Sequence, residues 1–353
     1  MVQAKNQRQP VGNPDDLIVI AGAGGFIAGA LTRYFHDRGF RRIRAIDKKP
    51  LYDWYQRVPG VESLCMDLSE KENCVRACEG AVEVYNLAAD MGGMGFIERF
   101  RVECLRSILI NTHMIEAAYR AGAERYFFSS SACAYNTELQ KDPHARALRE
   151  SDAYPAMAER GYGWEKLMSE MFCQEYWAER GLKTFIARFH NVYGPFGTWD
   201  GGREKAPAAI CRKVIEAKDT GSGRITIWGD GTQTRSFMYI DDCVQGIDMI
   251  MHCEKLIATP INLGSSELVS INELVSMVED IAGVKLKREY DLNAPRGVAG
   301  RNSDNTFIKQ VLGWEPSTPL RTGLAQTYAW IEQQYRDRKA GKRTVRESFN
   351  VQP

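Results

Sequence analysis

The stretch from residue 17 to residue 47 constrains the fold more than any other part of the chain. It begins with Leu17-Ile18-Val19-Ile20, an apolar run typical of a buried strand, and continues with a glycine-rich turn over 22–25. A helical pattern over 26–38 and a second apolar run over 42–46 follow. Two strands joined through a helix in this order make a βαβ unit, the building block of a parallel sheet.

The same alternation continues along the chain. Strand runs follow at 82–87, 125–129 and 183–188. They are separated by helical patterns near 104–121 and 163–180. We therefore expect an α/β fold with a Rossmann-type, doubly wound parallel sheet. After Tyr193-Gly194-Pro195 the chain turns to glycine-rich turns and shorter elements, which indicates a smaller, mixed α/β substrate-binding region at the C-terminal side.

Charge and cysteine usage narrow the classes of function. Lys and Arg number 46 against 45 Asp and Glu, so the net charge of +1 gives no broad electrostatic footprint for a nucleic acid or an anionic membrane. The nine cysteines show no paired CxxC spacing, so we expect free thiols in a cytoplasmic protein and no metal site. The uncharged run 17–31 follows Asp15 and Asp16, which argues against a signal peptide, and it is too short to span a bilayer.

The glycine turn sits where a dinucleotide fingerprint requires it. Gly22 and Gly25 permit a tight turn, and Phe26 and Ile27 open a helix whose N-terminal N–H groups can receive a pyrophosphate. A tight βα connection without a ligand is the plain alternative. Asp47 favours a cofactor, because a carboxylate at the end of the second strand accepts from a ribose 2′-hydroxyl and repels a 2′-phosphate.

These residues predict NAD rather than NADP. Lys48 and Lys49 argue for NADP, since lysines can screen a 2′-phosphate. Asp67, after the third strand, is either an adenine contact or a helix-capping carboxylate.

The patterns divide the chain into four parts. Residues 1–16 are expected to form a flexible tail, 17–195 an NAD-binding Rossmann domain, and 196–335 mainly a substrate-binding domain. Residues from roughly 236 to 265 are expected to return to the Rossmann domain. A helix is predicted over 322–335, and we interpret 336–353 as a basic, solvated tail.

Ser131, Tyr162 and Lys166 form a candidate alcohol-oxidising site. Tyr162 and Lys166 share one helical face, where the ammonium and a cationic nicotinamide are expected to lower the tyrosine pKa from about 10. Tyr162 can then take a hydroxyl proton while hydride leaves for NAD, and Ser131 hydrogen-bonds the same oxygen. A Tyr-x-x-x-Lys pair on its own is usually a surface pair, but here it follows a dinucleotide turn and a serine-rich strand end.

In this order the motifs resemble the extended short-chain dehydrogenase/reductase superfamily. Further matching segments are Asn86-Leu87-Ala88-Ala89, Arg188 to Pro195 and Gly229-Asp230-Gly231, so the resemblance covers nearly all of 17–335. It implies Leu87 and Ala88 as cofactor contacts and a homodimer formed through two helices of each subunit.

The two residues after Ser131 separate reactions within that superfamily. Nucleotide-sugar 4,6-dehydratases carry Asp-Glu there and 4-epimerases resembling the UDP-galactose enzyme usually carry Ala-Thr, whereas this chain has Ala132-Cys133. Three segments, 88–97, 194–213 and 300–305, resemble the GDP-mannose 3,5-epimerase family. That resemblance implies a GDP-mannose substrate, with Cys133 as general base and Lys205 as general acid.

A thiol and a lysine suit this chemistry. Oxidation of the sugar at C4 to a ketone makes the C–H bonds at C3 and C5 acidic, because an enolate delocalises the charge. Cys133 thiolate can remove such a proton and Lys205 can deliver one to the opposite face, after which hydride returns to C4. The implied products are GDP-L-galactose and, from inversion at C5 alone, GDP-L-gulose. A buried apolar thiol is the plain alternative for Cys133.

A GDP-sugar also needs partners for its phosphates and hydroxyls. Arg235, Arg301 and Lys213 fit phosphate contacts, the arginines by their bidentate geometry and the lysine as a point charge. The full set of expected substrate contacts is Gly92, Met94, Ser131, Ala132, Cys133, Asn191, Glu204, Lys205, Lys213, Gln233, Arg235 and Arg301.

Three other functions stay open at this point. The chain can be an epimerase of another GDP-linked hexose or heptose, or of a preformed 4-keto sugar, and the bulky Trp164 inside the Tyr-Lys motif leaves the exact sugar undecided. A nucleotide-sugar 4-epimerase gives Cys133 and Lys205 no role. A non-catalytic dinucleotide-binding regulator has no use for a complete set of Ser131, Tyr162 and Lys166.

Overall fold

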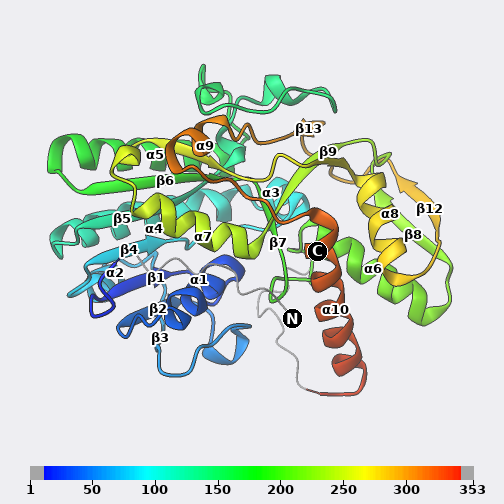
Figure 1. The fold of residues 1–353 in the computed structure, drawn as a ribbon, viewed down its shortest axis with the longest axis horizontal. Coiled ribbons are helices and arrows are strands. Elements are labelled where there is room, and N and C mark those ends of the chain that lie inside the picture. Colours follow the sequence, from blue (N-terminus) through cyan, green and yellow to red (C-terminus); the bar gives the residue numbers. More distant parts are fainter. Residues whose placement is uncertain (1–11, 343–353) are drawn as a thin grey trace.

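A seven-stranded parallel sheet forms the larger part of the molecule (Figure 1). The computed structural model describes residues 12–342. The strand order is β10-β6-β5-β4-β1-β2-β3. The strands are β1 Ile18–Ala21, β2 Ile43–Asp47, β3 Glu62–Cys65, β4 Glu83–Asn86, β5 Arg125–Ser131, β6 Lys183–Phe189 and β10 Pro260–Leu263. The predicted α/β fold with a Rossmann-type sheet is confirmed.

Helices cover both faces of this sheet, so its inner strands are buried on both sides, while the edge strand β3 is partly exposed. One face carries α1 (Phe26–Asp37) and α7 (Ile240–Met251), and the other carries α2 (Lys71–Cys78), α4 (Arg101–Arg120) and α5 (Tyr162–Arg180). From β1 the sheet first grows to one side through β2 and β3. The chain then returns to the other side of β1 with β4, so the strand order reverses between β1 and β4. A ligand crevice is expected beyond the carboxyl ends of the strands at that point.

A smaller lobe lies beside the sheet (Figure 1). It contains a four-stranded sheet, in which β9 pairs with β7, β11 and β13, and the parallel pair β8 and β12. Its strands are β7 Asn191–Tyr193, β8 Arg224–Trp228, β9 Thr234–Tyr239, β11 Leu268–Ser270, β12 Lys287–Asp291 and β13 Gly300–Arg301. Its helices are α6 Ala206–Thr220, α8 Ile271–Ala282 and α10 Leu320–Lys339, whereas α9 Thr306–Leu312 packs against β10 of the large sheet.

The remaining elements are short. They comprise α3 (Met94–Arg99) and the 3₁₀ turns Leu51–Asp53, Ala132–Ala134, Thr137–Gln140, Glu150–Ala153 and Glu254–Leu256. After β9 the chain returns to the large sheet, where α7 packs against α1 and β10 pairs with β6 at the sheet edge. In residues 12–342 no helix is long and apolar enough to cross a membrane.

The end of α10 corrects one expectation. The helix runs to Lys339, so residues 336–339 are helical and do not belong to a solvated tail. They are held by ion pairs, because Arg338 contacts Asp200 at 2.5 Å and Lys339 contacts Asp219 at 2.7 Å. Of the predicted tails 1–16 and 336–353, residues 1–11 and 343–353 lie outside the described residues. Residues 12–16 are not a free tail, because the Pro14 carbonyl accepts from the Arg41 N–H at 2.9 Å and Asp15 pairs with Arg41.

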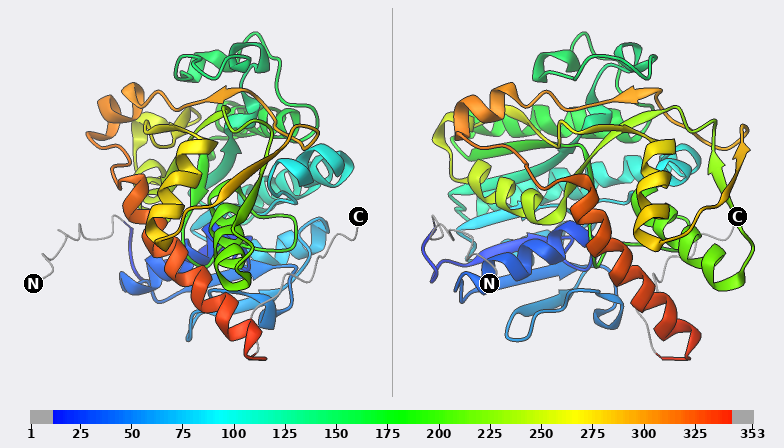
Figure 2. Two further views of the ribbon diagram at one scale, coloured as in Figure 1. Left: turned by 90° about the vertical axis from the view of Figure 1, so that its right-hand side faces the viewer. Right: turned by 45° about the vertical axis from the view of Figure 1, so that its right-hand side comes forward.

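Helix α10 lies at the boundary between the two parts of the molecule (Figure 2). It contacts α6, α8 and β9 of the smaller lobe. The ring of Trp330, on the same helix, lies 5.6 Å from that of Tyr55 and 5.4 Å from that of Phe196, both measured between centroids. The last long helix of the chain therefore joins the smaller lobe to the segments beside the large sheet.

A buried ionic network links α1, α7 and β4. His252, just after α7, contacts Glu83 Oε1 at 2.9 Å and Asp248 Oδ1 at 3.0 Å. The Tyr34 hydroxyl donates a hydrogen bond to Oδ2 of Asp248, and the Tyr85 hydroxyl donates one to Oε2 of Glu83. Burial disfavours the imidazolium, but the two carboxylates outweigh it and raise the pKa of His252 to about 10.

His252→Gln is expected to lower the free energy of unfolding by about 3–5 kcal/mol near pH 7, the range for breaking a buried ion pair. Because the folded pKa is raised, the contribution is complete below about pH 6.5 and is lost as the pH rises through about 10. Urea unfolding at several pH values should therefore show the wild type and the variant converging toward pH 10. His36→Gln, in an exposed pair, is the control, and a constant difference across the range would contradict the assignment.

Candidate active site

One cavity lies at the carboxyl ends of β1, β2, β4 and β5, where the strand order reverses. Its wall includes every residue that the sequence predicts for the cofactor, namely Gly22, Gly25, Phe26, Ile27, Asp47, Asp67, Leu87, Ala88, Tyr162 and Lys166. Gly92, Ser131 and Lys205, predicted for substrate or catalysis, line it too. The topology thus gathers residues from seven separate segments of the sequence into one space.

The glycine turn fits a closely approaching pyrophosphate. Gly22 has φ +85°, and a Cβ there would lie 2.9 Å from the carbonyl oxygen of Leu87. A Cβ on Gly25, the N-cap of α1, would lie 3.0 Å from the Gly22 carbonyl oxygen. Glycine leaves the backbone at the start of α1 open to the cavity, which is the arrangement that binds phosphate at a helix N-terminus.

Asp47 is fixed at the end of β2 by two backbone donors. One carboxylate oxygen accepts from the Gly24 N–H at 3.1 Å and the other from the Lys49 N–H at 2.9 Å. Lys48 contacts Asp90 across the cavity mouth at 2.6 Å, so its ammonium is committed to a carboxylate. Asp67 accepts from the Ser69 N–H at 2.9 Å and also lines the cavity. The polar wall around Asp47 suits a ribose.

Tyr162 and Lys166 lie one helical turn apart at the start of α5, facing Ser131 at the end of β5. The Lys166 side chain is buried, and its ammonium has no hydrogen-bond partner among the described residues. It lies 4.9 Å from the Phe128 ring centroid and 3.7 Å from a carboxylate oxygen of Glu165. A buried, unpartnered ammonium on the wall of a cavity fits the hydroxyls of a nicotinamide ribose.

The phenol of Tyr162 is governed first by its burial. Burial raises the pKa of Tyr162 well above 10, and the charges of Cys133 and Glu165 add to the increase. Ser131 opposes it through a hydrogen bond. The protein's own groups thus keep the phenol protonated, and a phenolate depends on further positive charge.

Cys133 lies in the 3₁₀ turn that follows Ser131, and its N–H donates to the Ser131 hydroxyl at 3.1 Å. Arg301 donates to the Cys133 sulfur at 3.4 Å. The same guanidinium donates to Gln140 at 2.6 Å and forms an ion pair with Glu159. Burial raises the pKa of the thiol and Glu159 adds to this, whereas Arg301 lowers it.

This contact was missed from the sequence. We expected Arg301 to hold a phosphate, and the structure places its guanidinium beside the thiol, 168 residues away along the chain. No local pattern pairs the two residues, because the contact depends on how β13 aligns with β9.

Lys205, the N-cap of α6, also lines the cavity. Burial lowers the pKa of its ammonium, and negative charge on Cys133 raises it. The two groups are therefore close enough to interact electrostatically, although 72 positions separate them in the sequence. A thiolate at Cys133 and an ammonium at Lys205 stabilise one another.

Arg235 also departs from its expected role. Its guanidinium donates to the backbone carbonyls of Thr234, Arg296, Val298 and Ala299, so it is committed to the protein itself. Burial, with Arg301 adjacent, lowers its pKa to about 10. We expected a phosphate contact here; the structure instead shows a cation that braces the β9–β13 region.

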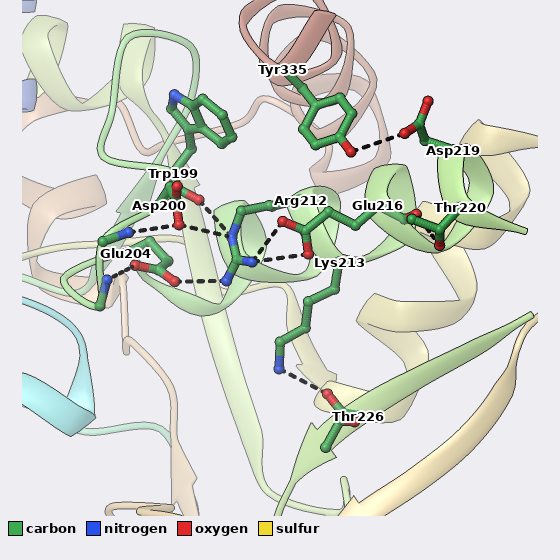
Figure 3. Close-up of polar contacts among 12 residues, drawn as sticks. Trp199, Asp200, Glu204, Arg212, Lys213, Glu216, Asp219, Thr220, Thr226 and Tyr335 are labelled. Atoms are coloured by element: carbon green, nitrogen blue, oxygen red, sulfur yellow. Dashed lines mark hydrogen bonds and ion pairs between the residues drawn. The ribbon is translucent and has the colours of Figure 1, made fainter. Parts of the chain in front are cut away.

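The other predicted substrate residues lie around the cavity rather than on its wall. Lys213 donates to the Thr226 carbonyl at 2.8 Å, and Glu204 pairs with Arg212 at 3.0 Å (Figure 3). Gln233 donates to the Trp228 carbonyl at 2.9 Å and Asn191 to the Ser236 carbonyl at 3.3 Å. Met94 lies against Gly297, and Ala132 is buried behind the serine-rich strand end.

Arg203 is a wall residue that the sequence analysis did not single out. Its guanidinium lies 4.0 Å from the Phe96 ring centroid and 3.7 Å from Asp90. It stands two positions before Lys205, so a cationic residue in the same glycine-rich loop was the available signal.

Comparison with known proteins agrees with this geometry. Residues 18–264 match the model of the NAD dependent epimerase/dehydratase family. GDP-mannose 3,5-epimerase of Arabidopsis thaliana is 44% identical, over 92% of this chain and 84% of its own. GDP-mannose 3,5-epimerase 1 of Oryza sativa subsp. japonica is 42% identical over 91% and 83%.

Among solved structures, MoeE5 in complex with UDP-glucose and NAD is 28% identical, with a TM-score of 0.74 over 91% of this chain and 99% of its own. UDP-glucose 4-epimerase from Thermotoga maritima superimposes with a TM-score of 0.80 over 90% and 99% of the two chains, at 21% identity, and supports the fold alone.

Asp47→Asn is expected to weaken NAD binding about 10- to 100-fold, since a hydrogen bond to a charged group contributes about 1.5–3 kcal/mol. The amide oxygen can still accept one of the backbone donors, which preserves most of the turn. Calorimetric titration should also show a smaller preference for NAD over NADP, because the repelling carboxylate is gone. Asp37→Asn, at the exposed end of α1, is the control, and an unchanged NAD to NADP ratio would contradict the role.

Proposed function

The chain belongs to the NAD-dependent epimerase/dehydratase family, and we propose that within it the chain acts as a GDP-mannose 3,5-epimerase. The proposal rests most on one observation: Ser131, Tyr162, Lys166 and Lys205 line one cavity, and Cys133, paired with Arg301, donates its N–H to the Ser131 hydroxyl. Oxidation alone requires only Ser131, Tyr162 and Lys166. The products are GDP-L-galactose and, after inversion at C5 alone, GDP-L-gulose.

NAD held by the cavity residues Gly22, Gly25 and Asp47 would supply the hydride acceptor for C4 of the sugar and the donor for its return. Tyr162 takes the proton of the C4 hydroxyl, while Ser131 donates a hydrogen bond to the same oxygen and holds it. Lys166 binds the ribose and adds positive charge beside the phenol. The cycle is redox-neutral, so no external oxidant is consumed.

The C4 ketone makes the neighbouring C–H bonds acidic, and Cys133 thiolate removes the proton from C3 or C5. The electron pair of that bond moves into the enolate, whose charge faces a cationic environment of Arg301, Arg235 and Lys205. Lys205 ammonium then delivers a proton to the opposite face of the carbon. This step inverts the centre and leaves a Cys133 thiol and a neutral Lys205, which exchange their proton with each other or with solvent.

Binding of the nucleotide sugar follows from the cations near the cavity. Lys213 turns from the Thr226 carbonyl to the diphosphate, and Gly92 lets the sugar lie against the backbone. Arg301 contributes charge at the sugar end, beside the thiol, instead of the phosphate contact first expected. Residues 17–195 with the returning segment 240–263 bind NAD, and the rest of 196–335 mainly binds substrate.

We propose a homodimer formed through α4 and α5, which pack side by side. Their outer faces expose large apolar side chains at helical spacing: Val102, Leu105 and Leu109 on α4, and Trp164, Met168 and Met171 on α5. Contiguous apolar surface of this kind marks an interface. All nine cysteines are free, which supports a reducing, cytoplasmic location.

The dimer is tested by Leu105→Glu with Met168→Glu, which places two charges in the proposed interface. Light scattering should give twice the monomer mass for the wild type and the monomer mass for the double variant. Leu139→Glu, an exposed leucine in a distant turn, should stay dimeric. A monomeric wild type would contradict this interface.

Solvent exchange tests the reaction itself. Purified, NAD-loaded protein incubated with GDP-mannose in deuterated water should place deuterium at C3 and C5 of the recovered sugar. Cys133→Ser should slow that exchange about 10²- to 10⁴-fold, the usual contribution of a general base, while single-turnover oxidation at C4 persists. Cys65→Ser, an exposed free thiol, is the control. Exchange absent from the wild type refutes the function, and exchange undiminished in Cys133→Ser refutes the base.

A further inference from the structure

The segment Phe196–Lys205 carries the proposed acid to the cavity. It connects β7 to α6, and four of its residues, Gly197, Thr198, Arg203 and Lys205, line the cavity wall. None of the hydrogen bonds or ion pairs within residues 12–342 involves the Lys205 ammonium. The place of that nitrogen therefore depends on the backbone that bears it.

Helix α10 holds the first half of this segment. The Trp330 ring lies 5.4 Å from that of Phe196, a residue with φ 66°, which non-glycine residues adopt only where the surroundings fix it. In the last turn of α10, the Arg338 guanidinium lies 4.1 Å from the centroid of the buried Trp199 ring. It also contacts Asp200 at 2.5 Å.

Arg212, on α6, holds the second half (Figure 3). Its guanidinium contacts Glu204 at 3.0 Å and Asp200 at 3.7 Å, and it donates to the Trp199 carbonyl at 3.2 Å. On the side away from the segment it contacts Glu216 at 3.0 Å. The planar guanidinium fork can meet several acceptors at once, which a lysine cannot do.

Glu204 is fully engaged by these contacts. One carboxylate oxygen faces Arg212, and the other accepts from the Gly202 N–H at 2.7 Å. Its side chain is 9% exposed, and that of Arg212 is 17% exposed, so solvent screens the pair only weakly. The residue directly before Lys205 is thereby fixed from two sides.

We propose that Arg212 and Arg338 are positioning residues, which clamp the segment Trp199–Glu204 between α6 and α10 and so fix Lys205 opposite Cys133. The clamp itself rests on the ion pairs, whereas its effect on catalysis rests on the proposed function. Proton delivery to one face of a carbon tolerates little displacement, since a shift of about 1 Å can cost about 10²-fold in rate. Through Arg338, helix α10 thus contributes to which face of the carbon receives the proton.

The structural half is tested by amide hydrogen exchange of the NAD-loaded protein without substrate. Arg212→Gln should raise exchange at least about fivefold in peptides that span 196–205, and Arg338→Gln should do so in the same peptides. Two matched controls should leave those peptides unchanged: Glu216→Gln removes an Arg212 contact on the side away from the segment, and Arg336→Gln removes an exposed pair on α10 itself. Unchanged exchange in both Arg212→Gln and Arg338→Gln overturns the clamp, whether or not the protein is an epimerase.

The catalytic half is tested by comparing two steps in the same variants. Arg212→Gln should reduce kcat for GDP-L-galactose formation about 10- to 100-fold, with KM within about threefold and single-turnover C4 oxidation within about twofold. Arg212→Lys should restore only part of kcat. Equal loss of oxidation and epimerisation indicates a general structural defect and overturns the positioning role, as does full activity in Arg212→Gln. If Arg212→Gln does not fold, the same two rates are compared in Arg338→Gln, because loss of the Arg338 guanidinium from α10 leaves α6 intact.

Discussion

The site depends on the close approach of α5 to the turn that holds Cys133. Gly163, between Tyr162 and Trp164, faces the Cys133 carbonyl so closely that any Cβ there would overlap it. The Glu159 N–H donates to that same carbonyl at 3.0 Å, so the chain entering α5 is fastened to the turn. This contact brings the Tyr162 phenol and the Ser131 hydroxyl together on the cavity wall, with the buried Cys133 thiol beside them, and so forms one corner of the site. Every further catalytic group has to reach that corner.

The second constraint is electrostatic. A buried thiol resists ionisation, and Glu159 beside it adds to that resistance, while Arg301 opposes both. Arg301 is held in place by Glu159 and Gln140, so the same carboxylate that disfavours the thiolate also fixes its cationic partner. Lys205 and Arg235 bring further positive charge from other segments. Such a corner is suited to negative charge that develops during a reaction, since the cations are in place before it forms.

Much of this was predictable from the sequence where the signal is local. The strands, the glycine turn with Asp47, and the Tyr162–Lys166 pair follow from short patterns, because helix and strand periodicity decides which side chains share a face. The parallel topology then forces their strand ends together. The contacts of Arg301, Arg235 and Arg338 were not predictable, because each joins residues far apart whose alignment is settled by strand pairing or helix packing. The boundary of α10 was wrong for the same reason: ion pairs to Asp200 and Asp219 extend the helix past the point where its apolar pattern ends.

In the proposed mechanism Cys133 and Lys205 serve opposite faces of one sugar ring. A crystal structure of the Cys133→Ser variant with NAD and GDP-mannose measures this directly. We expect the residue-133 side chain and the Lys205 ammonium on opposite faces of the ring, each within about 4 Å of C3 or C5, with the C4 hydroxyl between Tyr162 and Ser131. Both groups on one face, or a ring that neither of them reaches, would contradict it.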